Sequence, residues 1–187
     1  KSPQKMGDIG YLVGACLGNV GIERDKHGHS AAMTSVSSKG FADSLAAASN
    51  RTLNTDITAR NARTNAGNMA YAIRIGNLDF IQFFNKITNF GKRVPAQFLE
   101  KRAPVKIGFL KGVIDSHAST AHGAIIIRIR GRQLRDYTKT ELGKIGIPSA
   151  DSTDMSLRIN KPGLKTFREK IGFRDEKKAA ALENMAP

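Results

Sequence analysis

The sequence predicts a mixed α/β (α+β) fold that consists of two similar halves in one compact unit. Two glycine-rich helical segments, at residues 10–18 and 108–116, begin the halves, and their matched small residues lie 98 positions apart. Strand and helix patterns follow each of them in the same order. The 187 residues suffice to bury a core without disulfides, which the single cysteine, Cys16, could not form within the chain.

Small residues recur at every fourth position of both helical segments. Gly10, Gly14 and Gly18 form one stripe, and Gly108, Gly112 and Ser116 form the other. Glycine inside a helix costs up to about 1 kcal/mol relative to alanine, so a benefit that only glycine allows must offset it. We therefore expect the two stripes to pack face to face at short distance, with a pseudo-twofold axis between them.

The first half, assigned to residues 7–92, continues with two strands and two helices. Apolar alternation predicts strands at 30–38 and 69–75, and apolar periods of helical spacing predict helices at 41–53 and 78–90. Between them, residues 55–68 contain polar and glycine residues without an apolar period. This stretch predicts a long loop, which in a compact domain is usually functional or disordered.

A basic linker with prolines, at residues 93–104, leads into the second half at 105–187. After its glycine helix, the same criteria predict strands at 124–131 and 155–160 and helices at 133–145 and 163–173. A further helix is expected at 175–185. The second half thus repeats the order of the first and adds a helical tail.

The charge of the chain indicates a polyanionic partner. Thirty Lys and Arg residues against sixteen Asp and Glu residues give a net charge of +14, which favours nucleic acid and opposes self-association, so we expect a monomer. No segment has the amphipathic pattern of a membrane-surface helix, and no apolar run is long enough to span a bilayer. Without a signal-peptide pattern at the start, we expect an intracellular protein in a DNA-containing compartment, the cytoplasm or an organelle, and not a secreted one.

One strand of the second half carries the clearest binding pattern. Isoleucines at 125, 127 and 129 point to one face, and Arg128, Arg130 and Arg132 point to the other. A basic β-surface can enter the major groove, where arginine donates two hydrogen bonds to guanine. The predicted DNA-contacting residues of both halves are Lys26, His29, Ser35, Arg60, Arg63, Arg74, Arg128, Arg130, Arg132 and Arg158.

Two glycine helices, each followed by a strand-rich half, resemble the single-chain LAGLIDADG homing endonucleases over essentially the whole chain. Residues 12–20 lie on the family motif and residues 110–118 on its second copy, while residues 92–95 and 167–173 resemble flanking phrases of the family. The resemblance implies a duplicated αββαββα-type fold with two antiparallel sheets forming a saddle over double-stranded DNA. It also implies an intron- or intein-associated nuclease.

The resemblance also identifies the positions where catalysis would be located. In the family, the eighth motif position supplies an acid from each helix, and the two acids hold divalent metal; here these positions are Asn19 and His117. Asparagine offers a neutral oxygen and histidine a nitrogen, whereas Mg²⁺ prefers anionic oxygen. The glycine that follows is replaced by Val20 and Ala118. We expect a weak metal site at best, with Mg²⁺ or another divalent metal as cofactor if the protein is active and otherwise none.

Three functions remain open on the sequence. The first is sequence-selective binding of duplex DNA with cleavage weak or lost. The second is an active, metal-dependent endonuclease with a remodelled site, in which Asp115 could substitute as a ligand although its motif position is more often structural. The third is an RNA-binding intron maturase. Most aromatic residues lie at core periods, which leaves few for stacking on RNA bases and favours duplex DNA.

Overall fold

The computed structural model describes residues 2–17, 21–24 and 26–186. The elements of the first half and linker are α1 (Pro3–Cys16), β1 (Gly21–Arg24), β2 (Ser30–Val36), α2 (Lys39–Leu53), β3 (Arg60–Arg63), β4 (Met69–Ile75), α3 (Leu78–Thr88) and α4 (Ala96–Leu99). Those of the second half are α5 (Ala103–His117), β5 (Ala118–Ala121), β6 (Ala124–Arg128), α6 (Arg132–Lys144), β7 (Ala150–Asp151), β8 (Ser156–Ile159), α7 (Lys161–Lys170) and α8 (Glu176–Met185).

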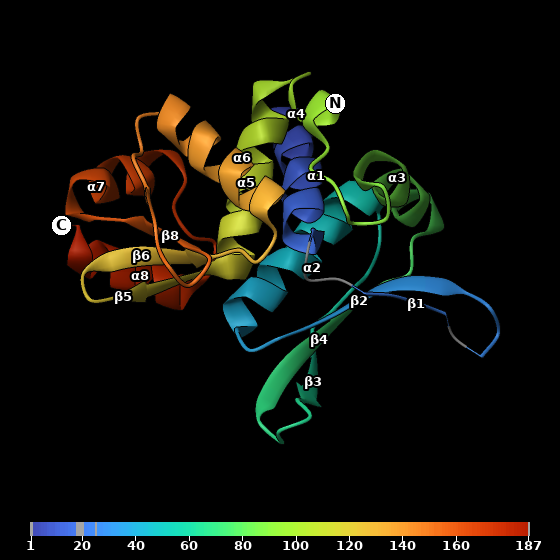
Figure 1. Ribbon diagram of the computed structural model, residues 1–187. Helices are drawn as coiled ribbons and strands as arrows, with labels where there is room; N and C mark the ends of the chain where they lie inside the picture. Colours follow the sequence, from blue (N-terminus) through green and yellow to red (C-terminus); the bar gives the residue numbers. More distant parts are fainter. Residues whose placement is uncertain (1, 18–20, 25, 187) are drawn as a thin grey trace.

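Two four-stranded antiparallel sheets repeat one strand order, β1-β2-β4-β3 in the first half and β5-β6-β8-β7 in the second. Figure 1 shows α1 and α5 side by side at the centre, with the first sheet at the lower right and the second at the left. One face of each sheet packs on helices through buried isoleucines such as Ile73 and Ile127. We call the opposite face of each sheet its outer face. The predicted mixed α/β fold with two antiparallel sheets is confirmed.

The glycine stripes form the contact between α1 and α5. A Cβ atom added at Gly10, Gly14, Gly108 or Gly112 would lie between 2.0 and 2.2 Å from a carbonyl oxygen of the facing helix. No real side chain tolerates such a distance to backbone, so glycine is required at all four positions. The predicted close packing is therefore confirmed for these glycines, whereas Gly18 lies outside the described residues.

The edge strands are the main difference from the sequence prediction. The stretch 55–68, predicted as a loop, contains β3, which pairs with β4 from Arg60 to Arg63. Strands β1, β5 and β7 were also not predicted, because they are two to four residues long and have few buried side chains. Such short, solvated strands have no apolar alternation to reveal them. Their pairing partners, β2, β4, β6 and β8, were all predicted.

The strand predicted at 124–131 is too long. It ends at Arg128, and α6 begins at Arg132 after Gly131 takes the extended conformation of an N-cap residue. Arg132 therefore lies on a helix rather than on the face of the strand, and its guanidinium is 3.5 Å from the Asp136 carboxylate one turn later. None of the described helices is long and apolar enough to cross a membrane.

Candidate nucleic-acid interface

The outer face of the second sheet carries two arginines. In the β6–β8 ladder, Arg128 lies opposite Ser156 and Ile126 lies opposite Arg158. The alternate residues of both strands, among them Ile125 and Ile127, are fully buried against helices. Because strand side chains alternate between faces, Arg128 and Arg158 point to the outer face. The side chain of Arg128 is 65% exposed, so it is available to a partner.

The outer face of the first sheet has a similar but sparser pattern. Ser35 and Arg60 both lie opposite Ala72 on its two neighbouring strands, and Arg74 lies opposite Met33. All three polar residues are exposed. Arg63 pairs with Met69 three register positions from Arg60 and therefore points to the other side, where its Nη1 donates to the Gly67 carbonyl oxygen at 3.3 Å. This face thus gathers Ser35, Arg60 and Arg74, three of the predicted contact residues.

The remaining predicted contact residues lie outside the strands. Lys26 and His29 are exposed and lie between β1 and β2. Arg130 is exposed in the segment between β6 and α6, and Arg132 is the first residue of α6. The structure therefore brings some predicted residues onto the outer faces and leaves the others at turns and at a helix start.

A hollow of about 480 Å³ lies where α5 ends, and we call it the central basin. Leu17, Ser116 and His117 line it from the ends of the two glycine helices. Its cationic lining consists of Lys92, Arg93, Arg128 and Arg130. The three of them other than Arg128, which is paired with Asp154, favour binding of anionic groups such as phosphate. The sequence analysis did not assign Lys92 and Arg93 to the site, although residues 92–95 had carried part of the family resemblance.

His117 enters the central basin as a neutral imidazole. Its Nδ1 lies 2.9 Å from the carbonyl oxygen of Val113, which can only accept a hydrogen bond, and 2.8 Å from the Ser116 hydroxyl; the Val113 contact favours the tautomer that carries the proton on Nδ1. Burial lowers the pKa of His117, and the positive charge of Lys178 lowers it further. At neutral pH the residue thus offers an unprotonated nitrogen and no negative charge.

Asp115, the other candidate on this helix, is engaged inside the protein. The Tyr11 hydroxyl donates to its Oδ2 at 2.7 Å, and the backbone N–H of Arg174 donates to its Oδ1 at 3.2 Å. The carboxyl is 1% exposed and does not line the central basin. Burial raises the pKa of Asp115 to about 6, against the hydrogen bonds that lower it. Both oxygens therefore have internal partners, and the geometry assigns Asp115 a structural role.

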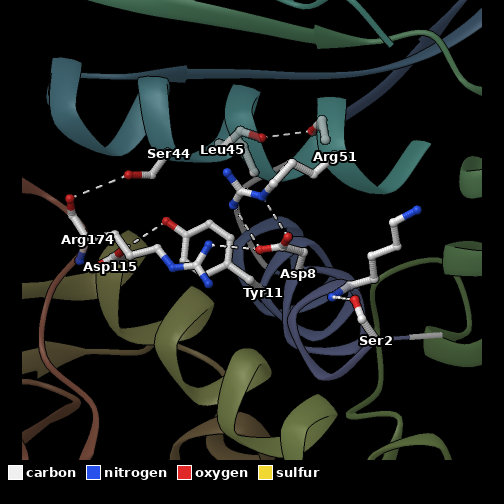
Figure 2. Close-up of polar contacts among 10 residues, drawn as sticks. Ser2, Asp8, Tyr11, Ser44, Leu45, Arg51, Asp115 and Arg174 are labelled. Carbon is white, nitrogen blue, oxygen red and sulfur yellow. Dashed lines mark hydrogen bonds and ion pairs between the residues drawn. The ribbon is translucent and has the colours of Figure 1, made fainter. Parts of the chain in front are cut away.

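Figure 2 shows the polar network around Asp115, which connects both halves to the C-terminal segment. The Arg174 guanidinium lies 4.1 Å from the Tyr11 ring centroid and 3.3 Å from the Asp8 carboxylate, which Arg51 also binds at 2.8 Å. Burial opposes ionisation of Asp8, but the two guanidinium groups outweigh it and hold the pKa of Asp8 below its ordinary value. Arg174 thus fixes the segment before α8 against the first half of the chain.

Solved structures of other proteins share the fold of this chain. The crystal structure of I-DmoI in complex with DNA and Ca matches with a TM-score of 0.67 and 16% identity, over 97% of this chain and 99% of that chain. The homing endonuclease I-WcaI bound to its DNA recognition sequence matches with a TM-score of 0.59 and 12% identity, over 96% and 88%. The chain has the LAGLIDADG homing-endonuclease fold.

A similar fold also occurs in a longer protein. Full-length DUF199/WhiA from Thermatoga maritima matches with a TM-score of 0.65 and 15% identity, over 99% of this chain but 60% of that chain. The LAGLIDADG fold is therefore also found within a longer protein. No protein-family model and no curated protein sequence matches the chain. At 12–16% identity, the structural likeness establishes the fold alone.

Structures with the LAGLIDADG fold have been determined with Mn, Mg and Ca, which makes the fit of a divalent metal a question for this chain. Asn19 lies outside the described residues. Within the described part, no three His, Cys, Asp or Glu side chains are grouped as metal ligands. His117 supplies a nitrogen, and Asp115 is bonded elsewhere. This donor set does not fit Mg²⁺, a hard cation that requires carboxylate and water oxygens.

Proposed function

We propose that this chain binds double-stranded DNA across the outer faces of both sheets and cleaves it weakly or not at all. The observation that carries the proposal is the repetition of an exposed cationic surface about the glycine-helix pair: Arg60 and Arg74 in the first half, Arg128 and Arg158 in the second. A pseudo-twofold pair of such surfaces matches a duplex, whose grooves recur along one axis. I-DmoI and I-WcaI, which share the fold, were determined in complexes with DNA.

Each part of the surface has a role in this proposal. The arginines of the outer faces contact base edges or phosphates in the major groove. Lys92 and Arg93 in the central basin bind phosphates between the two half-sites. Lys26 and His29, which lie between β1 and β2, contact the backbone at one end of the site. The net charge of +14 steers the chain to the duplex and makes binding sensitive to salt.

Weak or absent cleavage follows from the chemistry at the ends of the glycine helices. Two-metal hydrolysis of a phosphodiester depends on paired anionic ligands that hold metal on both reacting oxygens. Asn19 is neutral, and the basin side chain of His117 is a neutral imidazole. Asp115 already accepts two hydrogen bonds in the protein interior. These three residues therefore do not supply the paired anionic metal ligands that cleavage requires.

Binding of duplex DNA is favoured over binding of RNA because the described residues offer few stacking surfaces. Tyr11, Phe109 and Phe167 are fully buried in the core. Among the described Phe and Tyr residues, Phe90 is the one with a largely exposed side chain. Sequence-specific RNA binding generally stacks splayed bases on exposed aromatic rings.

Selection of bound sequences from random duplex DNA tests the proposal, followed by incubation of the selected duplex with Mg²⁺. We expect a defined site, preference for that duplex over structured RNA, and little or no cutting. The variant Asn19→Asp with His117→Asp shows whether the helix ends still direct two carboxylates at the DNA backbone, and we expect it to gain cleavage. Efficient cutting by the unmodified protein, or a stronger preference for RNA, would contradict the proposal.

A further inference from the structure

An aspartate stands beside one outer-face arginine. Nη2 of Arg128 lies 2.8 Å from Oδ2 of Asp154, which belongs to the turn between β7 and β8. The hydroxyl of Ser156 donates to the other carboxylate oxygen, Oδ1. Ser156 is 1% exposed and lies opposite Arg128 in the ladder. A buried hydroxyl on one side and a guanidinium on the other thus fix the Asp154 carboxylate.

The turn that carries Asp154 is itself held in place. The backbone N–H of Ser152 donates to the Ser156 carbonyl oxygen at 2.9 Å, and that of Ile129 donates to the Met155 carbonyl oxygen at 3.1 Å. Hydrogen bonds from Ser156 and Arg128 hold the pKa of Asp154 well below its usual range, so its carboxylate stays ionised at neutral pH. A negative charge is therefore fixed beside Arg128.

This fixed negative charge decides what Arg128 can bind. A carboxylate next to the guanidinium repels phosphate, whereas the O6 and N7 atoms of guanine are uncharged acceptors. Arginine has five N–H donors, so the hydrogen bond to Asp154 leaves enough of them for two bonds to a base. The ion pair also restricts the rotamers of Arg128 before binding, which reduces the conformational entropy lost when a base is contacted.

We infer that Arg128 reads a guanine in the major groove and that Asp154 is its positioning residue, an inference that rests on the proposed DNA binding. The matching ladder positions of the first half carry other residues. There, Ser35 occupies the place of Arg128 in the ladder and lies opposite Ala72, which in turn replaces Ser156. The guanine preference set by an arginine–aspartate pair of this kind is therefore expected in the half-site that the second sheet contacts.

The test compares base preferences of the parent protein and three variants in selections from random duplex DNA. We expect the parent to enrich guanine at one position of the second half-site and Arg128→Ala to lose that enrichment. Asp154→Asn should weaken it by about tenfold, which lies within the discrimination of one bidentate contact. The same variant should bind non-specific duplex more tightly, because a charge that repels phosphate is gone.

Asp151→Asn is the matched control. It removes the same charge from the same hairpin, but the Asp151 carboxylate pairs with Lys139 of α6 at 2.5 Å rather than with an outer-face arginine. Thermal unfolding of each variant verifies that the fold is kept. Unchanged guanine preference in Asp154→Asn, or equal relaxation in Asp151→Asn, would overturn the inference while leaving DNA binding intact. Failure of the parent to bind any duplex would instead overturn the proposed function, and the inference with it.

Discussion

The two halves share a backbone but carry opposite charges at one matched position. Asp8 on α1 and Lys106 on α5 lie 98 residues apart, like the paired glycines, and each bonds to the helix that follows β2 or β6 in its half. Asp8 binds Arg51 of α2 at 2.8 Å, and Lys106 lies 3.3 Å from Glu141 of α6. The duplication thus preserves a helix-to-helix ion pair while reversing its sign. The position of the helix-to-helix contact is the same in both halves, whereas both charges of the ion pair are exchanged.

The two outer faces also share their backbone positions but differ in some of their side chains. Arg74 and Arg158 lie on the equivalent strands β4 and β8, whereas Arg128 on β6 is matched by Ser35 on β2. The second half also carries α8, and Arg174, two residues before that helix, reaches back to the first half. Equal backbones with unequal outer faces are what recognition of an asymmetric DNA site requires, since each half can then contact a different sequence.

The largest expected effect concerns the feature that the halves share most closely. Gly14→Leu and Gly112→Leu should each destabilise the protein by more than about 4 kcal/mol, because an added Cβ would lie 2.1 or 2.2 Å from a backbone oxygen of the facing helix. Denaturant unfolding measures the change. Gly143→Leu on α6 is the control, since a Cβ there meets nothing within 4 Å. Equal stability of the three variants would refute the role of the stripes.

The reversed ion pairs should differ in strength because they differ in exposure. Asp8 is 1% exposed and binds two guanidinium groups, while the Lys106 side chain is 22% exposed and one of its two partners, Glu100, is 58% exposed. We expect Asp8→Asn to cost about 3 kcal/mol and Lys106→Gln about 1 kcal/mol in free energy of unfolding. If Lys106→Gln costs as much as Asp8→Asn, burial does not decide the strength of these pairs.

The free energy of unfolding should also depend on pH through Asp115. This effect arises in one half only, since Leu17 stands at the position that matches Asp115. The pKa of Asp115 is raised from 3.8 to about 6, so the folded protein binds its proton more tightly than the unfolded chain does. That contribution to the free energy of unfolding, about 2–3 kcal/mol, is complete below about pH 4 and is lost as pH rises to about 6. Unfolding from pH 4 to 7 should show this loss in the parent and not in Asp115→Asn. Parallel curves for the two proteins would contradict the assignment.

The parts of the fold that depend on local pattern could be predicted from the sequence. Glycine spacing identified the central helices, because close packing restricts residue type at Gly14 and Gly112 whatever surrounds them. Apolar alternation identified β2, β4, β6 and β8, the central strands of the two sheets, because one face of each is buried against helices. The edge strands were missed because they are short and mostly exposed, so their sequences show no alternation of apolar and polar residues.

The candidate site depends more on long-range contacts and was only partly predicted. Arg128 and Arg158 were found from strand alternation. Lys92 and Arg93 were not assigned, because only the folded linker brings them to the end of α5 beside Arg128. The partnership of Arg128 with Asp154 joins residues 26 positions apart, with α6 and β7 between them in the chain. No spacing in the sequence indicates that pair.

Salt dependence of binding to the selected duplex tests the central claim most directly. The account predicts that affinity falls steeply with salt concentration, with a slope in log–log form near 0.9 per phosphate contacted. Arg74→Ala and Arg158→Ala, one on each outer face, should each either weaken binding by about 1–3 kcal/mol if the contact is to a base or reduce the slope by about one if it is to phosphate. Affinity that is independent of salt, or that neither substitution changes, would contradict binding of DNA by the two outer faces.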